Sequence, residues 1–129
     1  MIRNLFRNPL RYLPLALIVA LIPVRAGSLL REVFADIPGN ALADMTNSPA
    51  YPNSPSETTV LTDLFEAPTD VLENYGQRLR GTFVAPVTGN YTFWVSSDDN
   101  GALFLSTDSN PVNSRLIAWV PEWSGSREW

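Results

Sequence analysis

Residues 89–106 read Gly-Asn-Tyr-Thr-Phe-Trp-Val-Ser-Ser-Asp-Asp-Asn-Gly-Ala-Leu-Phe-Leu-Ser. In residues 91–96, Tyr, Phe and Val alternate with Thr, Trp and Ser. This period of two is typical of a strand, and five of the six side chains are aromatic or β-branched. A second short apolar run occupies residues 101–106. The stretch therefore predicts a strand, a tight acidic loop and a second strand.

The loop between these two runs contains adjacent carboxylates, Asp98 and Asp99, followed by Asn100 and Gly101. Neighbouring carboxylates repel each other, so either water solvates both or a cation neutralises them. Calcium prefers six to eight oxygen ligands, and Asp98 and Asp99 supply two carboxylates while Asn100 adds an amide oxygen. The alternative is a plain hairpin turn, because Asp, Asn and Gly all tolerate turn geometry. The doubled acid favours the metal, since a turn needs only one.

Composition excludes several functional classes. The 129 residues include no cysteine and no histidine, so disulfides, thiol chemistry and the commonest general base are absent. All nine basic residues are arginine. Residues 27–129 hold five of them against thirteen acids, a net charge of −8, so we expect no nucleic-acid partner.

An enzymatic function is not expected from the acidic residues. Glycosidases need two carboxylates that face each other across a cleft, and adjacent Asp98 and Asp99 do not meet that geometry. The remaining acids are best explained as a solvated surface. A hydrolase would show activity that Asp98→Ala removes without a change in binding.

The first 26 residues have the layout of a secretory signal peptide. Arg3, Arg7 and Arg11 precede an apolar run, Tyr12–Val24, which is too short to span a bilayer. We predict a signal-peptide helix with cleavage after Ala26, the alternative being an uncleaved anchor. The membrane is then a transient partner only, and the mature chain is secreted, extracellular or on the cell surface, with the periplasmic side also possible.

Residues 27–129 are predicted to form one all-β domain, an antiparallel sandwich or barrel. Short strand patterns recur with turn residues between them, and a single helical turn is expected near Ala41–Met45. We expect the strand from Tyr75 to Val84 to form a hairpin with Tyr91–Ser96, and Gly101–Ser106 to pair with the latter. The remaining predicted strands are Leu29–Phe34, Thr58–Leu61 and Arg115–Val120.

The four tryptophans are a second group of candidate ligand-binding residues. Aromatic faces stack on sugar rings, but Trp94 and Trp119 lie in strand patterns, where packing in the core is the simpler interpretation. Trp123 lies in a turn rich in Pro, Gly and Ser and is the best candidate for an exposed role.

The chain resembles the protective-antigen-type (PA-14) domain, a β-sandwich module of secreted proteins. The resemblance covers residues 28–129 and is most specific in residues 85–99, where a Gly-x-Tyr-x-Phe run ends in the paired aspartates. Residues 27–34 and 75–81 also fit, and residues 126–129 fit bacterial members.

The resemblance implies a calcium-dependent lectin-like function. In sugar-binding members, a paired aspartate joined by a cis peptide holds calcium, and calcium coordinates sugar hydroxyls. The same resemblance places the family's last strands and a glycine-rich loop beyond Trp129, so we expect the domain to be truncated at its C-terminus. We predict an accessory module that binds a glycan or cell-surface polysaccharide through calcium. A structural or protein-interaction module without a sugar site is the alternative.

Overall fold

The computed structural model describes residues 27–129. Within this range the secondary structure is almost entirely β-strand. The elements are β1 (Leu29–Phe34), α1 (Leu42–Thr46), β2 (Glu57–Leu61), β3 (Gly76–Arg80), β4 (Gly101–Ser106), the 3-10 helix η1 (Pro111–Asn113) and β5 (Ser114–Val120). The predicted signal peptide, residues 1–26, lies outside the described residues.

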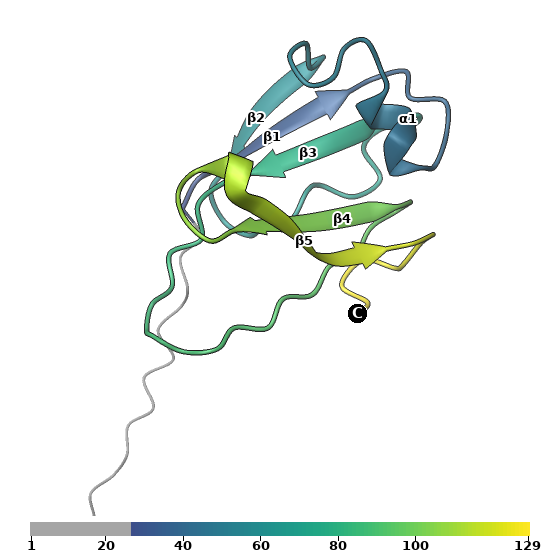
Figure 1. Ribbon diagram of the computed structural model, residues 1–129. Coiled ribbons are helices and arrows are strands. Elements are labelled where there is room, and N and C mark those ends of the chain that lie inside the picture. Colours follow the sequence, from purple (N-terminus) through teal and green to yellow (C-terminus); the bar gives the residue numbers. More distant parts are fainter. Residues whose placement is uncertain (1–26) are drawn as a thin grey trace, which may run out of the picture.

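The strands form two antiparallel sheets, which confirms the all-β prediction. One sheet has the order β2-β1-β3, and the other consists of β4 and β5. Figure 1 shows the two sheets as separate layers, with α1 packed near the start of β3. Among the described residues, no helix is long and apolar enough to cross a membrane.

β1 is the central strand, with β2 and β3 paired to its two edges, and five of its six residues are buried, on both faces of the sheet. Val33 and Phe34 are fully buried. The two charged residues of the strand, Arg31 and Glu32, are only 4% and 6% exposed. Buried charges are costly unless they are paired, so the strand requires charged or polar partners from its neighbours.

A small core cluster joins α1 to the three-stranded sheet. Phe34, Ile37 and Met45 are packed together, and Phe34 also contacts the ring of Tyr51 at a centroid distance of 5.3 Å. A Cβ atom on Gly76 would lie 2.6 Å from Met45 Sδ, so only glycine allows the helix to approach β3 this closely. The aromatic and thioether contacts thereby hold the loop that follows β1 against the sheet.

The predicted hairpin between residues 75–84 and 91–96 is wrong. β3 ends at Arg80, residues 91–96 are in no strand, and β4 pairs with β5 instead. Figure 1 shows the segment between β3 and β4 swinging away from both sheets before it returns to β4. Because backbone pairing defines a strand, an alternating pattern alone does not produce one. Phe83 nevertheless contacts the rings of Tyr91 and Phe93, with centroids 5.3 and 5.4 Å apart.

Candidate functional site

The Asp98–Asp99 loop is held by the chain segment that follows β5. Asp98 forms an isolated antiparallel β-bridge with Trp123. The neighbouring residues lock this contact, because the Ser124 N–H donates to the Ser97 carbonyl at 2.9 Å and the Ser97 N–H donates to Ser124 Oγ at 3.0 Å. The backbone position of Asp98 is therefore set by residues that are 25 positions further along the chain.

The other end of the loop is fixed by the segment before α1. The Asn100 N–H donates to the Asn40 carbonyl at 3.3 Å. A Cβ atom on Gly101 would lie 2.5 Å from Ser97 Cβ, so the loop folds tightly back on itself and needs glycine there. The acidic pair thus lies in a compact loop that contacts both the region near α1 and the end of the chain.

The two carboxylates have no cationic partner among residues 27–129. Four ion pairs form in this part of the chain, and none includes Asp98 or Asp99. Asp98 is exposed and Asp99 is half-buried, and the peptide bond between them is cis, as the resemblance implied. Both side chains are therefore available to a cation from solution.

The loop by itself does not complete a cage of acidic ligands. Within the described residues, no group of three or more His, Cys, Asp or Glu side chains gathers in one place. A calcium ion at Asp98 and Asp99 would take further oxygens from Asn100, from backbone carbonyls, from water or from a ligand, all of which calcium accepts.

The plain hairpin turn that was the alternative explanation for residues 98–101 does not form. A hairpin requires the two flanking segments to pair, and residues 91–96 are not paired with β4. The loop instead contacts Asn40 and Ser124, which are distant in sequence. The acidic pair is thus not needed to join two adjacent strands.

Trp123 lies beside Asp98, where the sequence could not place it. Directly opposed residues of an antiparallel pair have Cβ atoms about 5 Å apart and point to the same side. The Trp123 side chain is 61% exposed. The exposed indole of Trp123 and the exposed carboxylate of Asp98 therefore lie on the same side of the bridge. Trp94, Trp119 and Trp129 are also exposed, so the expectation that Trp94 and Trp119 pack in the core is wrong.

An ion pair secures the segment that carries Trp123. Arg127 donates through Nε and Nη2 to Glu66 Oε2, at 2.9 and 2.8 Å. The Arg127 backbone N–H donates to Ser96 Oγ at 3.2 Å. These contacts tie the end of the described chain to the loop after β2 and to the residue just before Ser97.

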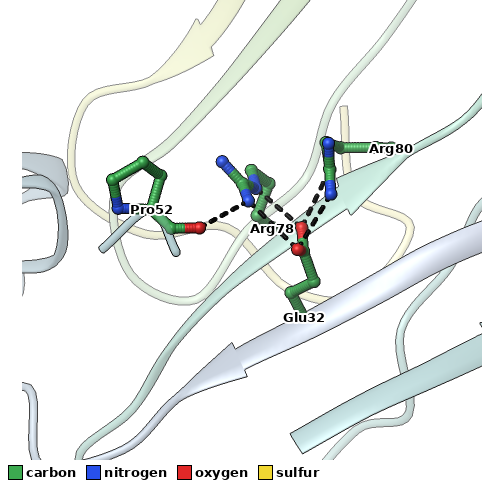
Figure 2. Close-up of polar contacts among 4 residues, drawn as sticks. All are labelled: Glu32, Pro52, Arg78 and Arg80. Carbon is green, nitrogen blue, oxygen red and sulfur yellow. Dashed lines mark hydrogen bonds and ion pairs between the residues drawn. The ribbon is translucent and has the colours of Figure 1, made fainter. Parts of the chain in front are cut away.

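An ionic cluster surrounds the buried Glu32 on the three-stranded sheet, and sequence reasoning did not find it. Figure 2 shows Glu32 between Arg78 and Arg80, with each guanidinium bonded to both carboxylate oxygens at 2.7 to 3.1 Å. Arg78 also donates to the Pro52 carbonyl at 2.9 Å and lies over the Tyr51 ring. The alternation along β3 puts Arg78 and Arg80 on one face of that strand, and only the pairing of β3 with β1 brings Glu32 between them.

The network shifts the titration of its members. Hydrogen bonds from Arg78, and secondarily from Arg80, lower the pKa of Glu32 despite the opposing effect of burial. The Glu32 carboxylate in turn raises the pKa of Arg78. The cluster of one carboxylate and two guanidinium groups has a net charge of +1, and both oxygens of the Glu32 carboxylate are occupied by the two arginines.

The comparisons with known proteins define the family. The PA14 domain profile matches residues 30–113, which is more than half of the chain. The chain therefore belongs to the PA14 domain family, as the resemblance suggested. No solved structure matches the chain significantly.

Curated relatives are similar to this chain over small parts of their length. The mouse (Mus musculus) N-acetyl-beta-glucosaminyl-glycoprotein 4-beta-N-acetylgalactosaminyltransferase 1 is 34% identical over 107 residues, covering 79% of this chain and 10% of the relative. Fibrocystin of the dog (Canis lupus familiaris) is 50% identical over 58 residues, covering 39% of this chain and 1% of the relative. Mouse fibrocystin is 40% identical over 52 residues, again 1% of its length. The chain thus spans a tenth or less of these proteins.

Proposed function

We propose that this PA14 domain is a carbohydrate-binding module that recognises a glycan through calcium held at Asp98, Asp99 and Asn100. The module is an accessory domain that acts outside the cytoplasm, secreted or on the cell surface. It binds without catalysing a reaction.

The observation that carries the proposal is the bridge between Asp98 and Trp123. Sugar recognition needs oxygen or metal ligands for the hydroxyl groups and an apolar surface for the ring face. The bridge places an unpaired carboxylate and a mostly exposed indole on one side of the same short contact. Calcium bound at the carboxylates and a sugar stacked on Trp123 would share this surface.

Two observations support a cation at the loop. Asp98 and Asp99 are adjacent, and neither has an arginine partner among the described residues, so two neighbouring negative charges are left without a compensating side chain. The loop is also braced from both ends by backbone hydrogen bonds, so few ligand groups need to be ordered when the ion binds. The family membership and the glycoprotein-directed name of one relative agree with a glycan ligand.

The second candidate function is a structural or protein-interaction module without a sugar site. It is favoured by the large number of exposed apolar side chains, including Phe65, Val84 and Trp94. A soluble domain that exposes many large apolar side chains is a candidate for contact with another protein.

Calcium titration by calorimetry on the full chain tests the metal. We expect binding that disappears when Asp98→Asn and Asp99→Asn are combined. The matched control is Asp63→Asn with Asp70→Asn, which removes two exposed carboxylates and the same charge elsewhere. Equal loss of binding in both variants would show that calcium responds only to net charge.

A glycan array, probed with calcium and then with a chelator, tests the sugar. We expect calcium-dependent binding to a subset of glycans, reduced at least tenfold by Trp123→Ala, while calorimetric calcium binding persists. Trp94→Ala is the control, because its side chain is similarly exposed, at 62%, but it is not bridged to Asp98. Calcium binding without any glycan binding would favour the structural module.

A further inference from the structure

A four-residue turn, Gly125–Glu128, follows the Trp123 bridge, and Arg127 occupies its second central position. The turn is closed by the Glu128 N–H, which donates to the Gly125 carbonyl at 3.0 Å. The φ angle of Arg127 is 60°, in the left-handed region. Glycine and asparagine are preferred at such a turn position, because a Cβ atom is crowded there. An arginine at this position therefore needs an explanation from its side chain.

Packing does not supply that explanation, because the Arg127 side chain is 60% exposed. Its Nε and Nη2 atoms both donate to Glu66 Oε2, at 2.9 and 2.8 Å, and Glu66 lies in the loop after β2. An exposed ion pair of this kind contributes no more stability than the left-handed backbone of a non-glycine residue costs. A gain in stability alone therefore does not account for the arginine.

The contacts of Arg127 bear on the geometry of the acidic loop. Its backbone N–H donates to Ser96 Oγ at 3.2 Å. The next two residues of the loop, Ser97 and Asp98, are held by the same segment, residues 123–127. The ion pair ties this segment to a third part of the chain, the loop after β2. Three successive residues that lead into the acidic pair are thus held by a segment that Arg127 anchors.

We propose that Arg127 is a positioning residue of the calcium site. By pairing with Glu66, it holds the segment that carries Trp123 against the acidic loop, so that Asp98 keeps its place for the ion. This inference rests on the proposed function, and it adds a contact outside the ligand groups on which calcium affinity depends. Without the pair, the segment leaves the loop more often, and calcium binds only the fraction of chains in which the loop is held.

Calcium titration of the full chain by calorimetry, without any sugar, tests this inference. We expect Arg127→Gly to weaken calcium binding about threefold to fivefold, the range that loss of one exposed ion pair allows. Simple electrostatics predicts the opposite direction, because removal of a positive charge by itself strengthens the binding of a cation. Since glycine suits the turn, the thermal midpoint without calcium should stay within about 4 °C of that of the unchanged chain.

Arg127→Lys is the rescuing variant. Both N–H groups of the arginine reach the same carboxylate oxygen, so one ammonium group can take their place, and calcium binding should stay within about twofold of the unchanged chain. Arg115→Gln is the matched control for charge. It removes an exposed guanidinium that forms no ion pair within residues 27–129, and it should not weaken calcium binding.

Calcium binding that Arg127→Gly leaves unchanged or strengthens would overturn the inference, and so would an Arg127→Lys chain that binds as weakly as Arg127→Gly. A thermal midpoint without calcium that falls by more than about 4 °C together with the affinity would identify a purely structural role, which also overturns it. An unchanged chain that binds no calcium would contradict the proposed function itself, and this outcome is distinct from failure of the inference alone.

Discussion

Glu32 is a charged side chain in the interior of the sheet, and its charge is retained because two guanidinium groups surround it. Its side chain is 7% exposed, whereas those of Arg78 and Arg80 are 22% and 53% exposed. Both arginines therefore keep contact with water while their hydrogen-bonding edges point inward. The arrangement is cheaper than a fully buried ion pair, because Arg80 keeps about half of its exposure to water and Arg78 keeps part of it.

Glu32→Gln should lower the free energy of unfolding by about 3 kcal/mol, the lower end for breaking a buried pair, because the arginines can turn toward solvent. Urea denaturation followed by tryptophan fluorescence measures the change. Glu66→Gln is the matched control, because this 35% exposed acid pairs with the 60% exposed Arg127 at 2.8 Å and should cost less than about 1 kcal/mol. If the two substitutions lowered the free energy of unfolding equally, this would contradict the claim that the buried Glu32 contributes more than an exposed acid.

The lowered pKa of Glu32 makes stability depend on acid pH. Its contribution is fully present above the ordinary carboxyl pKa of 4.5 and is lost as the pH falls through the lower value of the folded state. We expect the free energy of unfolding to fall as the pH is lowered below 4.5. The Glu32→Gln chain should show a shallower decline over the same range, and parallel curves for the two proteins would refute this.

At the scale of elements, β1 organises the first sheet and α1 closes one end of it. β1 contributes buried side chains on both faces, and α1 is only five residues long, so its stability comes from packing rather than from its own hydrogen bonds. The Met45 side chain lies so near Gly76 that a Cβ atom there would be 2.6 Å from Met45 Sδ.

Gly76→Ala should displace α1 and destabilise the protein by about 2 kcal/mol, because a new methyl group would overlap the Met45 side chain. Gly89→Ala is the control, since a Cβ atom there has no neighbour within 4 Å. Thermal unfolding monitored by circular dichroism compares the two. An unchanged midpoint for Gly76→Ala would show that Met45 rearranges freely.

At the scale of the whole molecule, the acidic loop is where distant parts of the chain meet. Asn40, Ser97 and Ser124 are brought together by backbone hydrogen bonds around Asp98 and Asp99. A ligand at this point would therefore restrain the region before α1, the start of β4 and the segment after β5 at once.

Calcium should raise the thermal midpoint of the whole domain if it binds only the folded chain. At a concentration one hundred times Kd, the gain is about 2.7 kcal/mol. Differential scanning calorimetry of the full chain measures it, with magnesium and the Asp98→Asn, Asp99→Asn variant as controls. A midpoint that calcium leaves unchanged, or that the variant shares, would count against a metal at the loop.

The local patterns of the chain predicted most of the secondary structure and the candidate residues. Leu29–Phe34 was predicted with its observed bounds, and the predicted strands near residues 58–61, 101–106 and 115–120 all form. The predicted pairing of residues 91–96 was wrong. An alternating pattern indicates which face of a strand each side chain would occupy, but it does not indicate which other segment pairs with that strand.

The sequence by itself determined the all-β class, the family and the position of the acidic pair, since these depend on residue types and their local order. Only the tertiary structure decided that Trp123 lies opposite Asp98, that Glu32 is enclosed by Arg78 and Arg80, and that β4 pairs with β5. These are contacts between residues far apart in the chain. They depend on register and on which segments lie side by side, and no local pattern encodes either.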